Sequence, residues 1–163
     1  MKLWDSFLEM VSDKNNLTDY KTYYSAIVKW TEKRIKLFTE EMIKSNDLDF
    51  LMNLDINEYI IENPDICLET EYERLKKMHM NNNRWIILMI ISNIMREMIT
   101  IKSDFDCPRC SGNTAFYIAE FDNSNERKRV LMCEECNWCL SENNSHIKKL
   151  IPASMNELWE LQI

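Results

Sequence analysis

Two short cysteine motifs, CPRC at positions 107–110 and CEEC at positions 133–136, lie in the last third of the chain. Each has the C-x-x-C spacing that lets two sulfurs of one turn reach a single metal ion. Two such turns supply the four thiolates of a closed tetrahedral zinc site. The spacing therefore predicts one structural zinc ion with the ligands Cys107, Cys110, Cys133 and Cys136.

The segment between the two motifs has the pattern of a β-hairpin. Residues 114–121 (TAFYIAEF) alternate and are rich in strand-forming residues, and residues 129–132 read as the returning strand. Residues 122–128 form the polar turn, and Trp138 to Leu140 can start a third strand. A hairpin of this kind would hold the two cysteine turns side by side.

Residues around the cysteines favour tight turns. Pro108 stiffens the first turn, and Gly112 can take a backbone conformation closed to most residues. Asn137 follows the second motif and tolerates the left-handed conformation best among non-glycine residues. Over residues 104–142 the arrangement resembles the zinc-ribbon superfamily. The resemblance implies a small antiparallel sheet around zinc but no particular function, because zinc ribbons occur in transcription factors, ribosomal proteins, enzymes and interaction modules.

Cys139 leaves the ligand assignment open, because Cys136 and Cys139 form another C-x-x-C. We favour Cys133 and Cys136, which directly follow the returning strand. In that interpretation Cys139 points from the third strand toward the core. The alternative is that Cys139 replaces Cys133 or Cys136 as a ligand.

Metal catalysis is not expected at this site. A catalytic zinc keeps an open position for water, whereas four thiolates close the coordination sphere. No H-x-E or H-E-x-x-H motif accompanies the cysteines, and a single glycine excludes the glycine-rich phosphate-binding motifs. His79 and His146 have no motif partner and are interpreted as a helix-end and a loop residue. The sequence therefore predicts a protein that is not an enzyme, with no evident small-molecule substrate.

Composition favours a helical, acidic protein. Of 163 residues, 45% are hydrophobic and 29% charged, so the chain should be globular. One glycine and three prolines favour helices with short connections. The formal charge of −7 is unsuited to coating nucleic acid and favours partners with basic surfaces.

The cysteines and the apolar runs indicate a cytoplasmic protein. Six cysteines could form three disulfides, but paired C-x-x-C motifs suit metal in a reducing compartment better. The N-terminus carries an acid at Asp5 and has no unbroken apolar run. The longest apolar run, Trp85 to Ile91, is far shorter than the roughly 20 residues of a membrane span.

Apolar periodicity predicts a mainly α fold. An N-terminal helical bundle over residues 1–103 precedes a domain of residues 104–163, which holds the zinc ribbon and a short terminal helix and packs on the bundle. Ser154 and Glu157 form a capping box for the terminal helix. The expected bundle helices span residues 3–11, 18–45, one or two helices within 47–63, 64–80, and 84–101, the last being the most buried.

Two charged segments are candidate interaction surfaces. Between Ser45 and Glu73 there are nine acids and no Lys or Arg, which indicates a solvated helical face or a docking surface for a basic protein. The residues proposed for docking are Asp47, Asp49, Asp55, Glu58, Glu62, Asp65 and Glu69. The hairpin tip carries Arg127, Lys128 and Arg129, which form an exposed turn or contact nucleic acid.

These patterns favour a non-catalytic zinc protein that binds and occludes a protein partner. Immunity proteins of bacterial toxins and phage-encoded inhibitors share this small, acidic, non-catalytic character, although no motif links the chain to them. The alternative is a nucleic-acid-associated zinc-ribbon regulator that uses the basic hairpin tip.

Overall fold

The computed structural model describes residues 2–63, 65–78, 80–121, 127–140 and 147–160. The chain forms two compact units. The helical unit contains residues 1–56 and 61–98, and the sheet unit contains residues 57–60 and 99–163. Pro64, the first residue of the helix expected over 64–80, lies outside the described residues, as do His79, His146 and turn residues 122–126.

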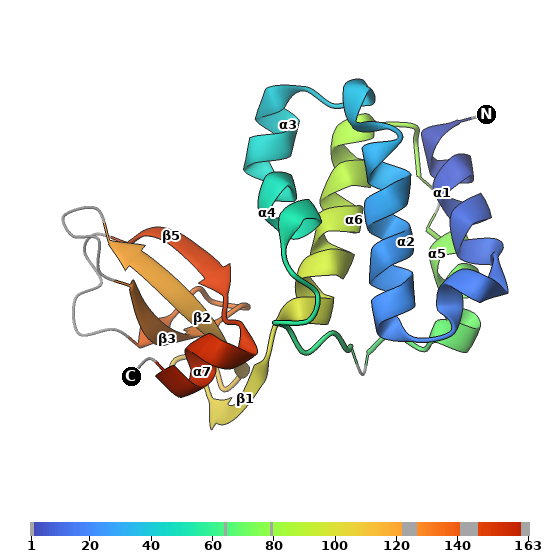
Figure 1. Ribbon diagram of the computed structural model, residues 1–163. Helices are drawn as coiled ribbons and strands as arrows, with labels where there is room; N and C mark the ends of the chain where they lie inside the picture. The colour runs from blue at the N-terminus through green and yellow to red at the C-terminus, as the bar shows by residue number, and fades with distance from the viewer. Residues whose placement is uncertain (1, 64, 79, 122–126, 141–146, 161–163) are drawn as a thin grey trace. The chain divides into compact units, whose positions relative to one another are not determined.

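The helical unit consists of α-helices with short 3₁₀ turns between some of them (Figure 1). In chain order its elements are α1 (Leu3–Ser12), η1 (Lys14–Leu17), α2 (Tyr20–Glu32), η2 (Ile35–Leu37), α3 (Glu40–Ser45), α4 (Leu48–Asn53), η3 (Leu68–Thr70), α5 (Glu71–Lys76) and α6 (Arg84–Ile99). A helical N-terminal part followed by a small antiparallel sheet and a short terminal helix confirms the predicted fold class.

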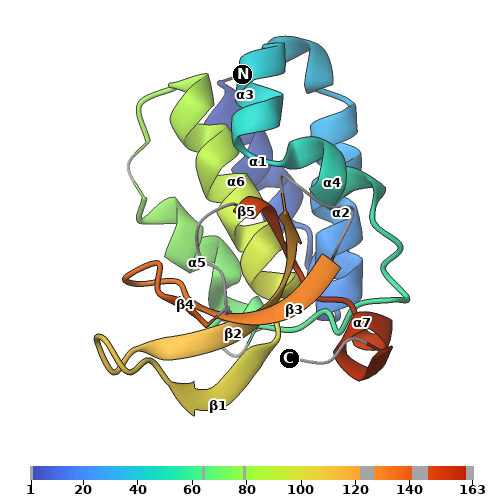
Figure 2. The same cartoon turned by 90° about the vertical axis from the view of Figure 1, so that its left-hand side faces the viewer.

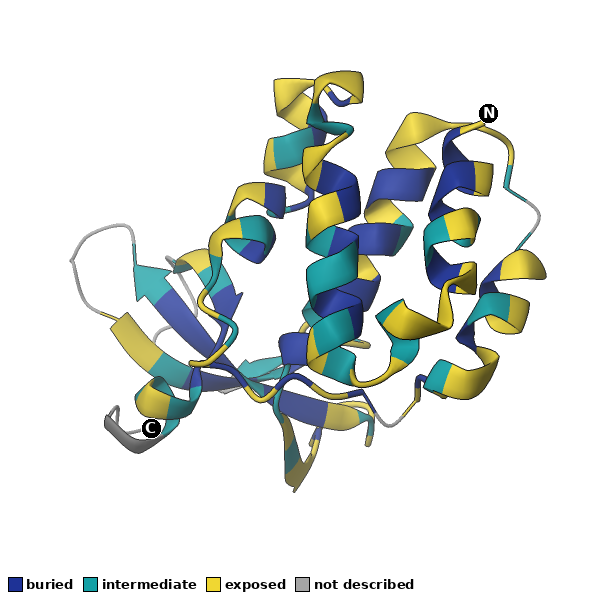
Figure 3. Cartoon of the chain, turned by 45° about the vertical axis from the view of Figure 1, so that its right-hand side comes forward, coloured by how far each residue is buried: buried dark blue, intermediate teal, exposed yellow. Residues whose placement is uncertain are grey.

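The core of the helical unit is formed by one face of each longer helix (Figure 3). α1 buries Leu3, Trp4, Phe7 and Val11, as its periodicity predicts. The largest completely buried side chains of the unit are Phe7, Tyr23, Tyr24, Ile27, Leu48, Leu51, Leu75, Ile87, Leu88, Ile91, Met95 and Met98. Five of them come from α6, so the prediction of a strongly buried helix there is correct for one face.

The prediction of one long helix over residues 18–45 is wrong, because α2 ends at Glu32. α2 begins after Asp19, whose carboxylate accepts the Thr22 N–H at 2.9 Å, so Asp19 is its N-cap. Thr39 starts a second helix by accepting the Met42 N–H at 3.3 Å. Thr39 therefore begins a new helix inside the apolar-periodic stretch, in which Phe38 and Met42 are still buried.

The helices expected over residues 47–63 and 64–80 are also much shorter. α4 ends at Asn53, after which Leu54 is extended. The Asn63 side chain accepts the Asp65 N–H at 2.9 Å, and the Thr70 N–H donates to the Cys67 carbonyl at 3.0 Å. Local turns of this kind satisfy backbone groups that a helix would otherwise pair.

Glu71 is the clearest departure from the expected acidic surface, since its side chain is completely buried. Its carboxylate accepts the Tyr23 hydroxyl at 2.9 Å and two guanidinium N–H groups of Arg74 at 2.7 and 2.8 Å. Burial, and then the Glu71 charge, raise the pKa of Tyr23 above its ordinary value. Glu71 therefore joins α5 to α2 inside the helical unit and is not available to a partner.

Replacing Glu71 should destabilise the helical unit. In Glu71→Ala the buried Tyr23 hydroxyl loses its acceptor, while the partly exposed Arg74 can still reach water. We expect the free energy of unfolding to fall by about 1–3 kcal/mol in urea denaturation. Glu73→Ala, at an exposed position two residues on, is the matched control and should change it little. Equal stability of the two variants would contradict this assignment.

The sheet unit is a five-stranded antiparallel sheet followed by a helix (Figure 2). Its elements are β1 (Lys102–Asp106), β2 (Asn113–Phe121), β3 (Arg127–Cys133), β4 (Cys139–Leu140), β5 (Ile147–Pro152) and α7 (Met155–Glu160). The predicted hairpin is β2–β3, and the third strand is β4, which pairs with β3. β1 and β5 both pair with β2 and were not predicted as strands.

The capping box predicted for the terminal helix is present. The Ser154 hydroxyl and N–H each donate to the Glu157 carboxylate at 2.9 Å. The Met155 N–H donates to the Glu58 carbonyl at 2.8 Å, which attaches residues 57–60 to the sheet unit. No helix within the described part of the chain is long and apolar enough to cross a membrane.

Candidate metal centre

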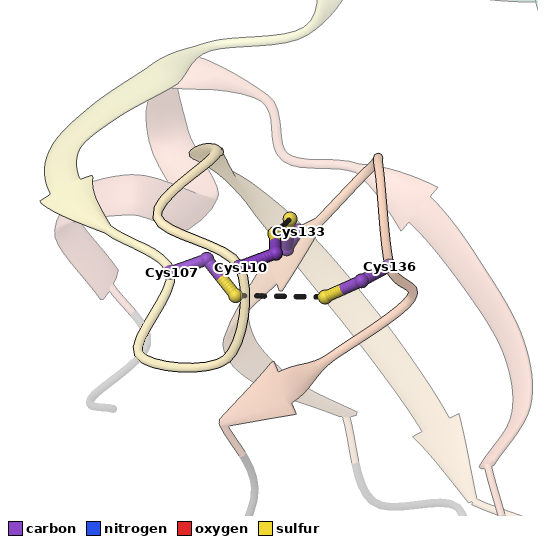
Figure 4. Close-up of side chains that lie close together, drawn as sticks. All are labelled: Cys107, Cys110, Cys133 and Cys136. Carbon is purple, nitrogen blue, oxygen red and sulfur yellow. Dashed lines mark hydrogen bonds between the residues drawn. The ribbon is translucent and has the colours of Figure 1, made fainter.

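Four cysteine side chains converge at one end of the sheet unit (Figure 4). The sulfurs of Cys107 and Cys136 lie 3.6 Å apart, those of Cys110 and Cys133 lie 3.5 Å apart, and all four lie within 4.8 Å of one another. A tetrahedron with metal–sulfur bonds of about 2.3 Å places its sulfurs about 3.8 Å apart. The cluster thus has the size that a four-thiolate metal site requires.

The two cysteine turns have the same backbone geometry. The N–H of the first cysteine donates to the carbonyl five residues later in both turns, from Cys107 to Gly112 and from Cys133 to Trp138, each at 2.8 Å. The residue after the second cysteine is left-handed in both turns, with φ of 60° at Ser111 and 55° at Asn137. Each turn therefore presents its two sulfurs in the same way.

The register of the β2–β3 hairpin brings the two turns together. Thr114 is paired with Cys133, so the first turn ends where the second begins. Cys107 and Cys133 are buried, Cys136 is half-buried and Cys110 is exposed. The site thus lies at the surface, with its two inner ligands fixed by the sheet.

Gly112 does not use its conformational freedom, whereas Asn137 is left-handed, the conformation that it tolerates well. Gly112 does not have a positive φ, because Ser111 takes the left-handed position instead. A Cβ at Gly112 would meet the Glu135 carboxylate at 2.6 Å. Since this carboxylate is the end of a flexible side chain, Gly112 is convenient for the close approach of the two turns but not essential to it.

Cys139 lies outside the sulfur cluster. It belongs to β4, pairs with Met132 of β3, and packs on a small buried cluster formed by Ala115, Tyr117, Ala119 and Val130. Burial raises the pKa of its thiol. The structure therefore favours Cys133 and Cys136 over the alternative with Cys139 as a ligand.

The thiols of the cluster strongly influence one another. Burial raises the pKa of Cys107, but the N–H groups of Arg109 and Cys110 and the Cys136 thiol outweigh burial and lower it to about 7. The Gly112 N–H lowers the pKa of Cys110, yet the thiols of Cys133 and Cys136 raise it to about 12. Four adjacent thiolates repel one another, so a bound cation is what allows all of them to ionise.

Such an arrangement can hold one metal ion with all four tetrahedral positions filled by sulfur. It is the only group of three or more metal-binding side chains found among the described residues. Comparison with protein-family models, curated proteins and solved structures gives no match. The likeness to zinc ribbons therefore concerns the cysteine site alone.

The acidic residues proposed for docking do not all belong to one unit. Glu58 is in the sheet unit and the others are in the helical unit. Asp47 has φ of 50° and forms an ion pair with Arg96 at 3.2 Å, so part of its charge is matched inside the unit. The side chains of the remaining residues are exposed: Asp49, Asp55, Glu58, Glu62, Asp65 and Glu69.

Arg127 and Arg129 of the hairpin tip make contacts within the sheet unit that occupy their guanidinium groups. Arg127 forms ion pairs with Glu157 of α7 at 2.7 Å and with Glu120 of β2 at 3.6 Å. Arg129 donates to the Leu158 carbonyl of α7 and lies over the Phe116 ring at 5.8 Å. Lys128 is exposed. The alternation of β3 gave no signal for these contacts, which depend on where α7 lies.

Metal stoichiometry distinguishes the four ligands from the spare thiol. We expect the wild-type protein to bind one zinc ion per chain, and Cys107→Ser to lose affinity by more than the roughly 10–100-fold that loss of an outer-shell partner costs. Competition with a chromophoric chelator measures both values. Cys139→Ser is the matched control and should bind zinc as the wild type does. Loss of binding in Cys139→Ser with retention in Cys107→Ser would refute the assignment.

Proposed function

We propose that the four cysteines hold a structural zinc ion and that the protein acts without catalysis, by binding a protein partner with a basic surface. The closed sulfur cluster is the observation that supports the structural zinc ion. Sulfur-only tetrahedral sites suit zinc or iron, and zinc with four thiolates is the usual structural centre. Since four sulfurs leave no position for water or substrate, the ion stabilises the fold and does not take part in a reaction.

The net negative charge of the chain supports a partner with a basic surface. The formal charge of the chain is −7. Four thiolates around Zn²⁺ contribute about −2 more. An acidic protein associates faster with a basic surface, because complementary fields steer the encounter. We propose that the protein occludes a basic surface, in the manner of toxin-immunity proteins and phage-encoded inhibitors that mask basic nuclease surfaces.

The nucleic-acid alternative has less support. Nucleic-acid binding relies on Lys and Arg side chains that can reach phosphates. The carboxylates of Glu120 and Glu157 already pair with Arg127, and the guanidinium of Arg129 is directed to Leu158 and Phe116. A phosphate at the hairpin tip would therefore have to compete with contacts inside the sheet unit.

Removing the metal should loosen the sheet unit selectively. Without a cation the four thiolates cannot remain together, and binding free energy at such sites is folding free energy. After chelation we expect hydrogen exchange to accelerate over β1 to β4 and much less over α1, α2 and α6. Hydrogen-exchange mass spectrometry with and without zinc measures this difference. Equal acceleration in all segments, or none, would contradict a local structural role.

The partner itself is tested by affinity capture and charge neutralisation. The zinc-loaded chain should capture one basic protein from its native host in a stoichiometric complex, measured by light scattering after gel filtration. Neutralising Asp49, Glu62, Asp65 and Glu69 to their amides should weaken the complex and reduce its salt dependence. Capture of nucleic acid without protein, or a complex that charge neutralisation leaves unchanged, would contradict the proposed mode of binding.

A further inference from the structure

An exposed aromatic pair lies beside the cysteine turns. Phe105 of β1 is 48% exposed, the most of any large hydrophobic residue noted in the described chain. Its ring is stacked on Trp138, with centroids 6.4 Å apart and planes inclined by 21°. Trp138 follows the second cysteine turn, and its carbonyl accepts the Cys133 N–H. The hairpin and the two cysteine turns thus hold the pair in place.

The pair is placed to offer side chains rather than backbone to a partner. The Phe105 N–H donates to the Ser103 hydroxyl at 3.0 Å, and the Phe105 carbonyl accepts the Thr114 hydroxyl. β1 is also irregular, because its register with β2 shifts between Lys102 and Asp106. Addition of a partner strand along this edge is therefore disfavoured, and the ring faces are what remains exposed.

The surroundings of the pair are strongly acidic. Asp104 and Asp106 flank Phe105, and Glu134 and Glu135 lie in the turn that leads to Trp138; all four are exposed. Arg109 is the only basic residue in residues 104–112 and 133–138, so these segments carry a charge of −3. A bound four-thiolate zinc centre would add about −2. The field there attracts cations and repels phosphates.

We propose that Phe105 and Trp138 form a docking surface for an exposed Lys- or Arg-rich segment of a partner protein. An aromatic face binds ammonium or guanidinium groups through its quadrupole, and the four nearby carboxylates add long-range attraction. Stacking of nucleic-acid bases uses the same rings but requires a positively charged groove, which these segments lack. The inference rests on the proposed function in that it names where a basic partner would bind.

A labelled peptide of alternating Arg and Gly tests the surface on the zinc-loaded full chain by fluorescence anisotropy. Phe105→Ala should weaken binding about two- to fivefold. Phe105→Leu, which keeps apolar area but no ring, should weaken it similarly, whereas Phe105→Tyr should bind as the wild type does. Trp85→Ala, which removes an aromatic side chain of 38% exposure from α6, is the matched control and should have no effect.

A second experiment removes the positive charge of the peptide or the negative charge of the protein surface. The same peptide with citrulline in place of arginine should bind much more weakly, and Asp104→Asn with Glu135→Gln should reduce both affinity and salt dependence. Unchanged affinity in the Phe105→Ala, Phe105→Leu and charge-neutralised variants would overturn the proposal. So would tighter binding of a single-stranded oligonucleotide that is lost in Phe105→Ala. Retained zinc stoichiometry verifies that the sheet unit of each variant is folded, and an unchanged far-UV circular dichroism spectrum verifies the helical unit.

The outcomes for this surface and for the proposed function can be separated. If capture of a basic host protein is lost on neutralising the helical-unit acids but unchanged in Phe105→Ala, the proposed function stands and this surface is refuted. If no host protein is captured but the arginine peptide still depends on Phe105, the surface stands and the proposed function fails.

Discussion

Four cysteine sulfurs lie close together in the sheet unit, and the structure of this unit depends on them. They can all be deprotonated at once only if a cation is bound between them. The β2–β3 register places Cys133 opposite Thr114 and so puts the two cysteine turns next to each other. The paired N–H to carbonyl bonds and the left-handed Ser111 and Asn137 then aim all four sulfurs at one point. Each thiolate would repel the others, so a metal ion held by the four sulfurs would supply the attraction that joins the turns.

Because four sulfurs would fill the coordination sphere of a bound ion, we propose that the protein acts through surfaces other than the metal site. Four sulfurs would leave a bound ion no open coordination position, so the surfaces proposed for binding are those that the fold positions elsewhere. In the sheet unit these are the Phe105–Trp138 pair and its neighbouring acids, while Arg127 and Arg129 are occupied by contacts with α7 and the sheet. In the helical unit, Glu71 forms part of the core and the acids around it remain exposed.

The features that the sequence predicts correctly are those that depend on residues near one another in the chain. The C-x-x-C spacing, the alternation of β2, the Ser154–Glu157 capping box and the apolar periodicity of α1 all have their expected structure. Features that depend on distant partners were missed. β5 is a strand because β2 offers it an edge, residues 57–60 join the sheet unit through a bond to Met155, and Glu71 is buried because Tyr23 and Arg74 meet it there. The break after Glu32 was missed because the apolar pattern continues across it while Thr39 caps a new helix.

The most direct test of a four-thiolate zinc centre is X-ray absorption spectroscopy of the purified full chain at the zinc edge. We expect one shell of four sulfur scatterers at about 2.3 Å, with no light-atom ligand. The spectrum should be the same in Cys139→Ser. A shell that includes oxygen or nitrogen would contradict the closed site, because it would mean an open or mixed coordination sphere. Zinc absent from the folded protein, with the cysteines joined in disulfides, would contradict the account as a whole.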